Sequence, residues 1–218
     1  AIASGEMELA IAGGVESMSR APFVMGKAES GYSRSMKLED TTIGWRFVNP
    51  LMKSQYGVDA MPETADNVAD DYQVSRADQD AFAVRSQQKA AAAQAAGFFA
   101  EEIVPVRIAG RKGETVVEQD EHLRPDTTLE TLARLKPVNG PDKTVTAGNA
   151  SGVNDGAAAL ILASAEAVEK HGLTPTAREL GIDRVGTAPP ITGLSPQTAP
   201  SLLPQTLGLH AGAYLVTQ

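Results

Sequence analysis

Residues 144–163 read TVTAGNASGVNDGAAALILA, and the fold is decided here. The second part, residues 157–163, is an apolar run whose length and lack of polar residues predict a fully buried β-strand. The first part is rich in glycine and small residues, so backbone amides there are free to point outward toward a ligand. Taken alone, this Gly-rich passage is more typical of a tight strand connection than of a ligand-binding loop.

A second apolar run lies near the start of the chain, at residues 9–12, and predicts another core strand. It ends in Gly13 and Gly14, which allow close backbone approach. The glycine pair lacks the G-x-G-x-x-G spacing, so it does not indicate a dinucleotide site. The sequence therefore predicts two core strands separated by a long insertion.

The insertion begins irregularly and then becomes helical. Residues 19–62 show little periodicity, which is typical of a functional loop. Local signals in the remainder predict a helix over 63–72, an Ala-rich helix capped by Ser75 and stopped by Gly97, a hairpin over 103–118, and a short helix capped by Asp126 or Thr127. After the second core strand, Ser164 is expected to cap a helix that ends near His171.

Composition excludes several classes of function. The net charge is −8 and the isoelectric point is about 4.9, which disfavours binding to nucleic acid or to an anionic membrane surface. No apolar run reaches the length of a membrane span, and we expect a cytoplasmic protein. The three histidines are far apart, so no metal site is predicted. The chain contains no cysteine, which excludes a thiolate nucleophile.

Several longer motifs occur in one order and at consistent spacing. They are AGGVESMS at 12–19, KLEDTTIGWR at 37–46, MPETA at 61–65, SRADQD at 75–80, EEIVPV at 101–106, and the Gly-rich passage at 144–156. Together they resemble the thiolase family of acyl-CoA acyltransferases. The 37–46 motif is most similar to the bacterial members that act in aromatic degradation.

The resemblance implies an α/β fold in which two similar halves stack as five layers, α/β/α/β/α, with an inserted α+β loop domain. Residues 1–18 would end the N-terminal half, and residues 144–175 would supply its last strand and helix. Residues 19–143 would form the loop domain, which carries coenzyme A (CoA) contacts and tetramer contacts. Residues 176–218 would begin the C-terminal half, where the match thins.

The resemblance also implies thiolytic cleavage of a 3-oxoacyl-CoA, such as 3-oxoadipyl-CoA, to acetyl-CoA and a shortened acyl-CoA. The family attacks the ketone carbonyl with a cysteine, and this chain has none. The catalytic cysteine, histidine and asparagine blocks are expected before Ala1 and after Gln218. The chain alone is therefore predicted to be inactive and to hold no catalytic residue.

The resemblance implies that this chain contributes contacts to CoA. Five positions fall where the family lines its CoA site: Met61, Arg124, Thr131, Ala147 and Ser151. Arg124 would lie near the nucleotide, and Ala147 and Ser151 along the pantetheine arm. Without the resemblance, Arg124 would be interpreted as a solvated surface residue and Met61 as a core filler.

The implied partners are CoA, acyl-CoA and further copies of the same chain, as a homotetramer or homodimer. CoA would be a substrate, and no permanently bound cofactor or metal is expected. Two other functions remain open from the sequence. One is a non-catalytic CoA- or acyl-binding protein on the same scaffold, and the other is an oligomerisation module.

Overall fold

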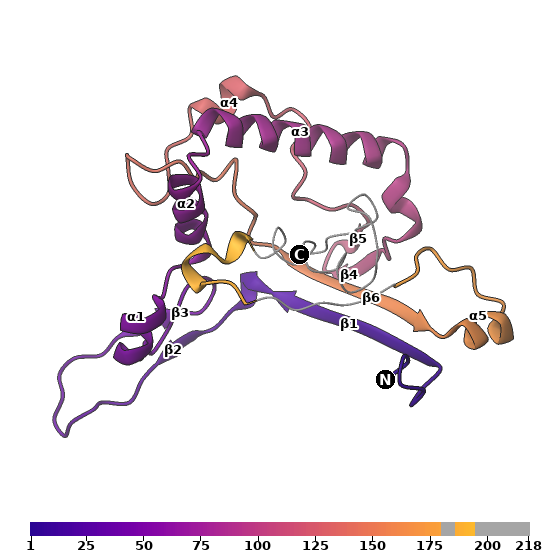
Figure 1. The fold of residues 1–218 in the computed structure, drawn as a ribbon, viewed down its shortest axis with the longest axis horizontal. Helices are drawn as coiled ribbons and strands as arrows, with labels where there is room; N and C mark the ends of the chain where they lie inside the picture. Colours follow the sequence, from indigo (N-terminus) through magenta and orange to yellow (C-terminus); the bar gives the residue numbers. More distant parts are fainter. Residues whose placement is uncertain (180–185, 195–218) are drawn as a thin grey trace. The chain divides into compact units, whose positions relative to one another are not determined.

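The two predicted core strands are neighbours in the computed structural model of the chain, which describes residues 1–179 and 186–194. Strand β1 (Leu9–Ser17) pairs antiparallel with β6 (Asp155–Ala163) along its whole length. Figure 1 shows them as two long arrows side by side. The two predicted strands are both present, and the structure adds that they pair with each other.

Gly13 explains how closely these strands approach. A Cβ built on Gly13 would lie 2.6 Å from the carbonyl oxygen of Ala158 on β6. A Cβ on Gly14 would meet no atom within 4 Å. Within the described residues, the close approach of β6 therefore requires a glycine at position 13 but not at position 14.

The predicted burial of these strands is wrong for the residues that the structure describes. Ile11 is 78% exposed, Val15 80% and Leu160 67%. Among the described residues, β1 and β6 form a sheet of only two strands. A strand is buried on both faces only when further layers cover it, and apolar periodicity cannot show whether this chain contains those layers.

Short elements occupy the irregular segment after β1. The helical turn η1 (Met18–Arg20) is followed by strands β2 (Phe23–Met25) and β3 (Leu38–Asp40), which pair antiparallel, and by helix α1 (Pro50–Tyr56). Asn49 caps α1, because its side-chain oxygen accepts hydrogen bonds from the amides of Leu51 and Met52. These elements are too short for their periodicity to be visible in the sequence.

Helix α5 (Ala165–His171) follows β6 and confirms the prediction made from its caps. The Ser164 hydroxyl accepts a hydrogen bond from the amide of Ala167 at 3.1 Å. Gly172 ends the helix in a left-handed conformation, with φ of 61°. The turn η3 (Pro189–Leu194) is the last described element, so most of the predicted start of a second half, 176–218, lies outside the described residues.

The helical part of the insertion follows its local signals. It contains α2 (Met61–Asp71), α3 (Arg76–Ala95), the turn η2 (Phe98–Glu101), the hairpin β4 (Val106–Gly110) and β5 (Gly113–Val117), and α4 (Leu129–Ala133). Ser75 caps α3 by accepting from the Asp78 amide at 3.1 Å, and Gly97 has φ of 75°. The predicted helices and hairpin are confirmed.

The predicted cap of α4 is wrong by one residue. Thr128 is the N-cap, and its hydroxyl accepts from the Thr131 amide at 3.2 Å while Thr131 Oγ1 accepts from the Thr128 amide at 3.1 Å. This is a capping box with threonine in both places. Thr127 belongs to the preceding turn, because its hydroxyl donates to the carbonyl of Arg124 at 2.7 Å.

The chain divides into two units, residues 1–64 with 153–218 and residues 65–152. The first contains the β1–β6 pair, and the second contains most of the helical insertion. None of the helices in the described ranges combines the length and the apolar character needed to cross a membrane.

Replacing Gly13 with alanine should destabilise the chain, because the carbonyl of Ala158 belongs to the backbone and cannot rotate away. We expect Gly13→Ala to lower the free energy of unfolding by about 1–3 kcal/mol, measured by urea denaturation. Gly14→Ala is the matched control and should change it by less than about 0.5 kcal/mol. Equal effects of the two substitutions would contradict the close approach at Gly13.

Candidate functional site

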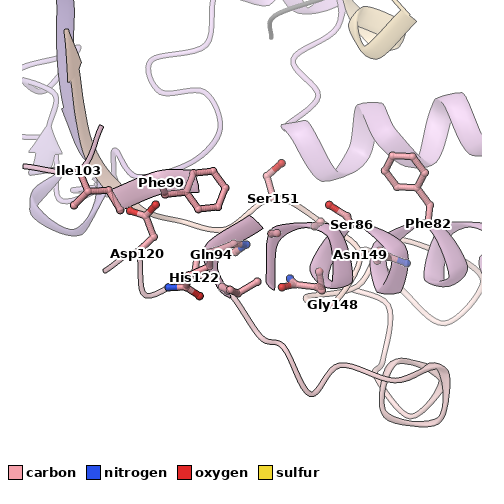
Figure 2. Close-up of a pocket in the computed structure, with 15 residues that line it drawn as sticks. Phe82, Ser86, Gln94, Phe99, Ile103, Asp120, His122, Gly148, Asn149 and Ser151 are labelled. Atoms are coloured by element: carbon pink, nitrogen blue, oxygen red, sulfur yellow. The ribbon is translucent and has the colours of Figure 1, made fainter. Parts of the chain in front are cut away.

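A hollow of about 430 Å³ opens within residues 65–152 and gathers residues from four parts of that unit. Figure 2 shows side chains of α3, of the segment around η2 and of the 148–151 loop around it. The lining residues are Phe82, Ala83, Ser86, Gln87, Ala90, Gln94, Phe99, Ile103, Asp120, His122, Leu123, Gly148, Asn149, Ala150 and Ser151. The walls are mainly apolar, with hydroxyl, amide, carboxylate and imidazole groups among them.

Three of the five predicted contact residues lie in or beside this hollow. Ser151 lines it directly. Arg124 follows the lining residue Leu123, and its backbone amide donates to the side chain of Gln87 at 2.9 Å. Ala147 precedes the lining residue Gly148 and is itself exposed. The structure therefore brings Ala147, Ser151 and the backbone of Arg124 to one region.

The other two predicted contact residues are not among the lining residues. Thr131 lies on α4, and its hydroxyl is engaged in the capping box, where it also donates to the Thr128 carbonyl at 2.9 Å. Met61 starts α2 in the first unit and is exposed. CoA contact at all five positions stays a prediction.

The loop on the rim of the hollow, residues 146–151, is held by hydrogen bonds among its own residues; we call it the rim loop. Thr146 is fully buried, and its amide donates to Asn149 Oδ1 at 2.7 Å. The Gly148 amide donates to Thr146 Oγ1 at 3.2 Å. A Cβ on Gly148 would lie 2.4 Å from Leu132 and 2.5 Å from Leu135, so α4 and the residues after it pack directly over this glycine. The space beside Gly148 is therefore filled by the ends of two leucine side chains.

A buried carboxylate, Asp66 on α2, holds the segment that leads into this loop. It is 2% exposed and accepts hydrogen bonds from the amides of Thr144 at 2.9 Å and Val145 at 3.1 Å. It also accepts from the Asn139 side chain at 2.7 Å and the Thr144 hydroxyl at 3.1 Å. Burial alone would raise the pKa of Asp66, but these hydrogen bonds favour the charged form and lower its pKa below 3.8.

A second buried carboxylate, Asp80 on α3, holds the loop itself. It is 4% exposed, and it accepts from Arg76 Nε at 2.8 Å and from Asn149 Nδ2 at 3.0 Å. In the sequence, Asp80 stands out only as part of the SRADQD motif, and no pattern marks Asp66. The spacing of Arg76 and Asp80, four residues apart on one helix, is the signal that could have marked the pair.

The lining of the hollow is suited to holding a ligand. The described ranges contain no group of three or more His, Cys, Asp or Glu residues placed to hold a metal ion. The hollow combines apolar walls with a serine hydroxyl and several amide groups, which suits a long, thin ligand that has its own amides. No thiol is present anywhere in the sequence.

Comparison with protein families matches residues 1–166 to the family described as "Thiolase, N-terminal domain". The chain belongs to the thiolase family. The match includes β1, the insertion and β6, so the predicted resemblance is confirmed.

Relatives with curated descriptions are also thiolases. The chain is 84% identical over all 218 residues to a beta-ketoadipyl-CoA thiolase of Pseudomonas putida, covering 54% of that protein. It is 57% identical over 210 residues to a 3-oxoadipyl-CoA/3-oxo-5,6-dehydrosuberyl-CoA thiolase of Escherichia coli, covering 52% of it. The chain thus spans about half the length of the curated relatives it matches.

Solved thiolase structures share the fold. The human mitochondrial 3-ketoacyl-CoA thiolase matches with a TM-score of 0.82 and 40% identity, over 96% of this chain and 52% of that one. A crystal structure of the human mitochondrial 3-ketoacyl-CoA thiolase in complex with CoA matches with a TM-score of 0.81 and 41% identity, over 95% of this chain and 51% of that one. The chain therefore has part of the thiolase α/β fold.

Stability should depend on pH through Asp66. Because its pKa is lowered on folding, its contribution is complete above the ordinary pKa of 3.8 and is lost as the pH falls through the lowered value. At pH 7 we expect Asp66→Asn to reduce the free energy of unfolding by about 1–3 kcal/mol in urea denaturation. The difference in free energy of unfolding between wild type and Asp66→Asn should become smaller at the lowest pH at which the chain folds.

The exposed Asp71, on the same helix, provides the control for this prediction. Asp71→Asn should change stability by less than about 0.5 kcal/mol at neutral pH. A gap between wild type and Asp66→Asn that stays constant as the pH falls would show that the charge of Asp66 does not stabilise the fold.

Proposed function

We propose that this sequence is part of a thiolase that cleaves 3-oxoadipyl-CoA with CoA, releasing acetyl-CoA and a shortened acyl-CoA. The observation that carries the proposal is the 84% identity over all 218 residues to a beta-ketoadipyl-CoA thiolase. At this identity the backbone of the hollow and the residues around it are expected to serve the same ligand. The nucleophilic cysteine comes from outside these 218 residues, which contain none.

The contribution of this chain to the reaction is CoA binding. We assign the hollow within residues 65–152 to part of the CoA molecule, with Ser151 as a hydrogen-bonding partner of the pantetheine amides and Arg124 as a partner of the phosphates. The apolar lining, including Phe82, Phe99 and Ile103, suits the aliphatic parts of that arm. This assignment is supported by a solved thiolase relative described in complex with CoA.

We also propose that the thiolase assembles with copies of itself, as a homodimer or homotetramer. The segment after β1 supports this, because it exposes large apolar side chains at Phe23, Met25 and Leu38 on the β2–β3 pair. Exposed apolar patches of this kind typically mark an interface.

The activity is tested in a chimera, in which this 218-residue sequence replaces the matching segment of the Pseudomonas putida relative. We expect the chimera to cleave 3-oxoadipyl-CoA in the presence of CoA, followed as formation of acetyl-CoA. The 218-residue chain alone should show no turnover, because it lacks a thiol. A folded chimera without thiolytic activity would contradict the proposal, and CoA binding without turnover would favour a binding protein instead.

Two substitutions in the chimera test the CoA assignment. Ser151→Ala should weaken CoA binding about three- to tenfold, the effect of one lost hydrogen bond. Arg124→Ala should weaken it about tenfold or more, because a charge-assisted bond to phosphate is stronger. Both are measured as the Kd for CoA by isothermal titration calorimetry.

The control for Arg124 is Arg107→Ala, since Arg107 lies on the β4 strand and pairs with Glu114 at 2.7 Å. That variant removes the same charge from the same unit and should bind CoA as the wild type does. Unchanged affinity in both Ser151→Ala and Arg124→Ala would remove the proposed site.

A further inference from the structure

A chain of polar contacts runs behind the rim loop and connects it to α4. We call these contacts the Arg76–Asp80–Asn149 bridge. One carboxylate oxygen of Asp80 accepts a hydrogen bond from Asn149 Nδ2 at 3.0 Å, and the other accepts from Arg76 Nε at 2.8 Å. Asp80 is 4% exposed and is not among the lining residues of the hollow. It therefore cannot act on a ligand in the hollow except through its partners.

The far end of the bridge holds the C-terminal end of α4. Arg76 Nη2 donates to the carbonyl of Leu132 at 2.7 Å and to that of Leu135 at 3.2 Å. The Leu132 carbonyl also accepts from the Leu135 amide at 2.9 Å, so the guanidinium adds a second donor there and ties the helix end to the carboxylate. Its planar fork directs one nitrogen at the carboxylate and another at the helix end, whereas a lysine offers a single nitrogen.

The near end of the bridge sets the turn of the rim loop. While Asn149 Nδ2 donates to Asp80, and to the Thr144 carbonyl at 3.2 Å, its Oδ1 accepts from the Thr146 amide at 2.7 Å. Asp80, which can only accept when ionised, thus orients the Asn149 amide so that its oxygen faces Thr146. The loop that carries Ala147 and Ser151 takes its conformation from this orientation.

Packing makes the two ends interdependent. Gly148 lies against the side chains of Leu132 and Leu135, so tightly that a Cβ would be 2.4 and 2.5 Å from them. The two residues whose carbonyls Arg76 binds are therefore the two whose side chains press on the loop. A shift of this end of α4 would move the loop, and the bridge opposes that shift.

We propose that Asp80 is a positioning residue for CoA binding, which acts through Asn149 and Arg76 to hold the rim loop against α4. The inference rests on the proposed function, because it assumes that the hollow beside Ser151 receives CoA. Its consequence is that ligand affinity depends on a carboxylate that never touches the ligand.

The experiment uses the chimera with Asp80→Asn, which keeps the shape of the side chain but removes its charge and one acceptor. We expect the KM for CoA to rise about tenfold, with kcat within about twofold of wild type, since the loop would lose its orientation while the reacting groups stay in place. Ser75→Ala is the matched control. It removes the cap of the same helix and lowers thermal stability, but it should leave the KM for CoA unchanged.

A double-mutant cycle separates positioning from general loosening. If Asp80 acts by placing the rim loop, Asp80→Asn and Ser151→Ala together should raise the KM for CoA by clearly less than the product of their separate effects. A rise in the KM for CoA equal to the product of the two separate effects would overturn the proposal. So would an unchanged KM in Asp80→Asn, or an equal rise in Ser75→Ala.

If the proposed function is wrong, the unsubstituted chimera will show neither turnover nor CoA binding. The positioning role is then tested without ligand, by hydrogen exchange at the amides of Gly148 and Asn149, both of which donate to Thr146. Faster exchange in Asp80→Asn than in Ser75→Ala supports the bridge, and equal rates overturn it.

Discussion

The antiparallel pairing of β1 with β6 is the constraint on which the rest of the described structure depends. Because Ser17 lies opposite Asp155, the chain must leave and return at the same end of the ribbon, and everything between becomes one closed insertion. The Asp155 carboxylate fixes this exit by accepting from the amide and the hydroxyl of Ser19, at 2.9 and 2.5 Å. The entropic cost of closing a loop rises only slowly with its length, so the strand pairing tolerates an insertion large enough to form a separate unit with its own hollow.

Within residues 65–152 the order of the site comes from polar groups more than from an apolar core. The buried apolar residues of this unit are small or few, namely Ala69, Leu132 and Val145. Polar groups are buried beside them. The carboxylates of Asp66 and Asp80 accept hydrogen bonds from distant segments, and Thr146 is hydrogen-bonded within its own loop. A satisfied buried network specifies one conformation sharply, because any displaced partner leaves a charge or dipole without compensation. Such a network holds the glycine-rich segment in one conformation.

Sequence reasoning succeeded where a structural signal is local. Ser75 with Gly97, and Ser164 with Gly172, marked their helices because caps are set within a few residues. It failed where the outcome depends on distant groups. Nothing near Asp66 shows that its partners lie after residue 138, and nothing near Asp80 shows that Asn149 donates to it. The apolar run in β6 could not show that its faces are open in the described residues. The family resemblance supplied Ser151 and Arg124, but it gave no indication of the carboxylates behind the loop.

The exposed ribbon of β1 and β6 has a practical consequence for anyone handling this polypeptide. Residues 157–162 are an uncharged run, AAALIL, and within the described residues both edges of the two-stranded ribbon carry backbone groups that no third strand satisfies. Such a segment is a template for strand addition by other molecules, and it also has the composition of sequences that stack into fibrils. We expect the polypeptide to self-associate as its concentration rises unless another layer of protein covers the ribbon. Its colloidal behaviour would then reveal whether that layer is present before any assay does.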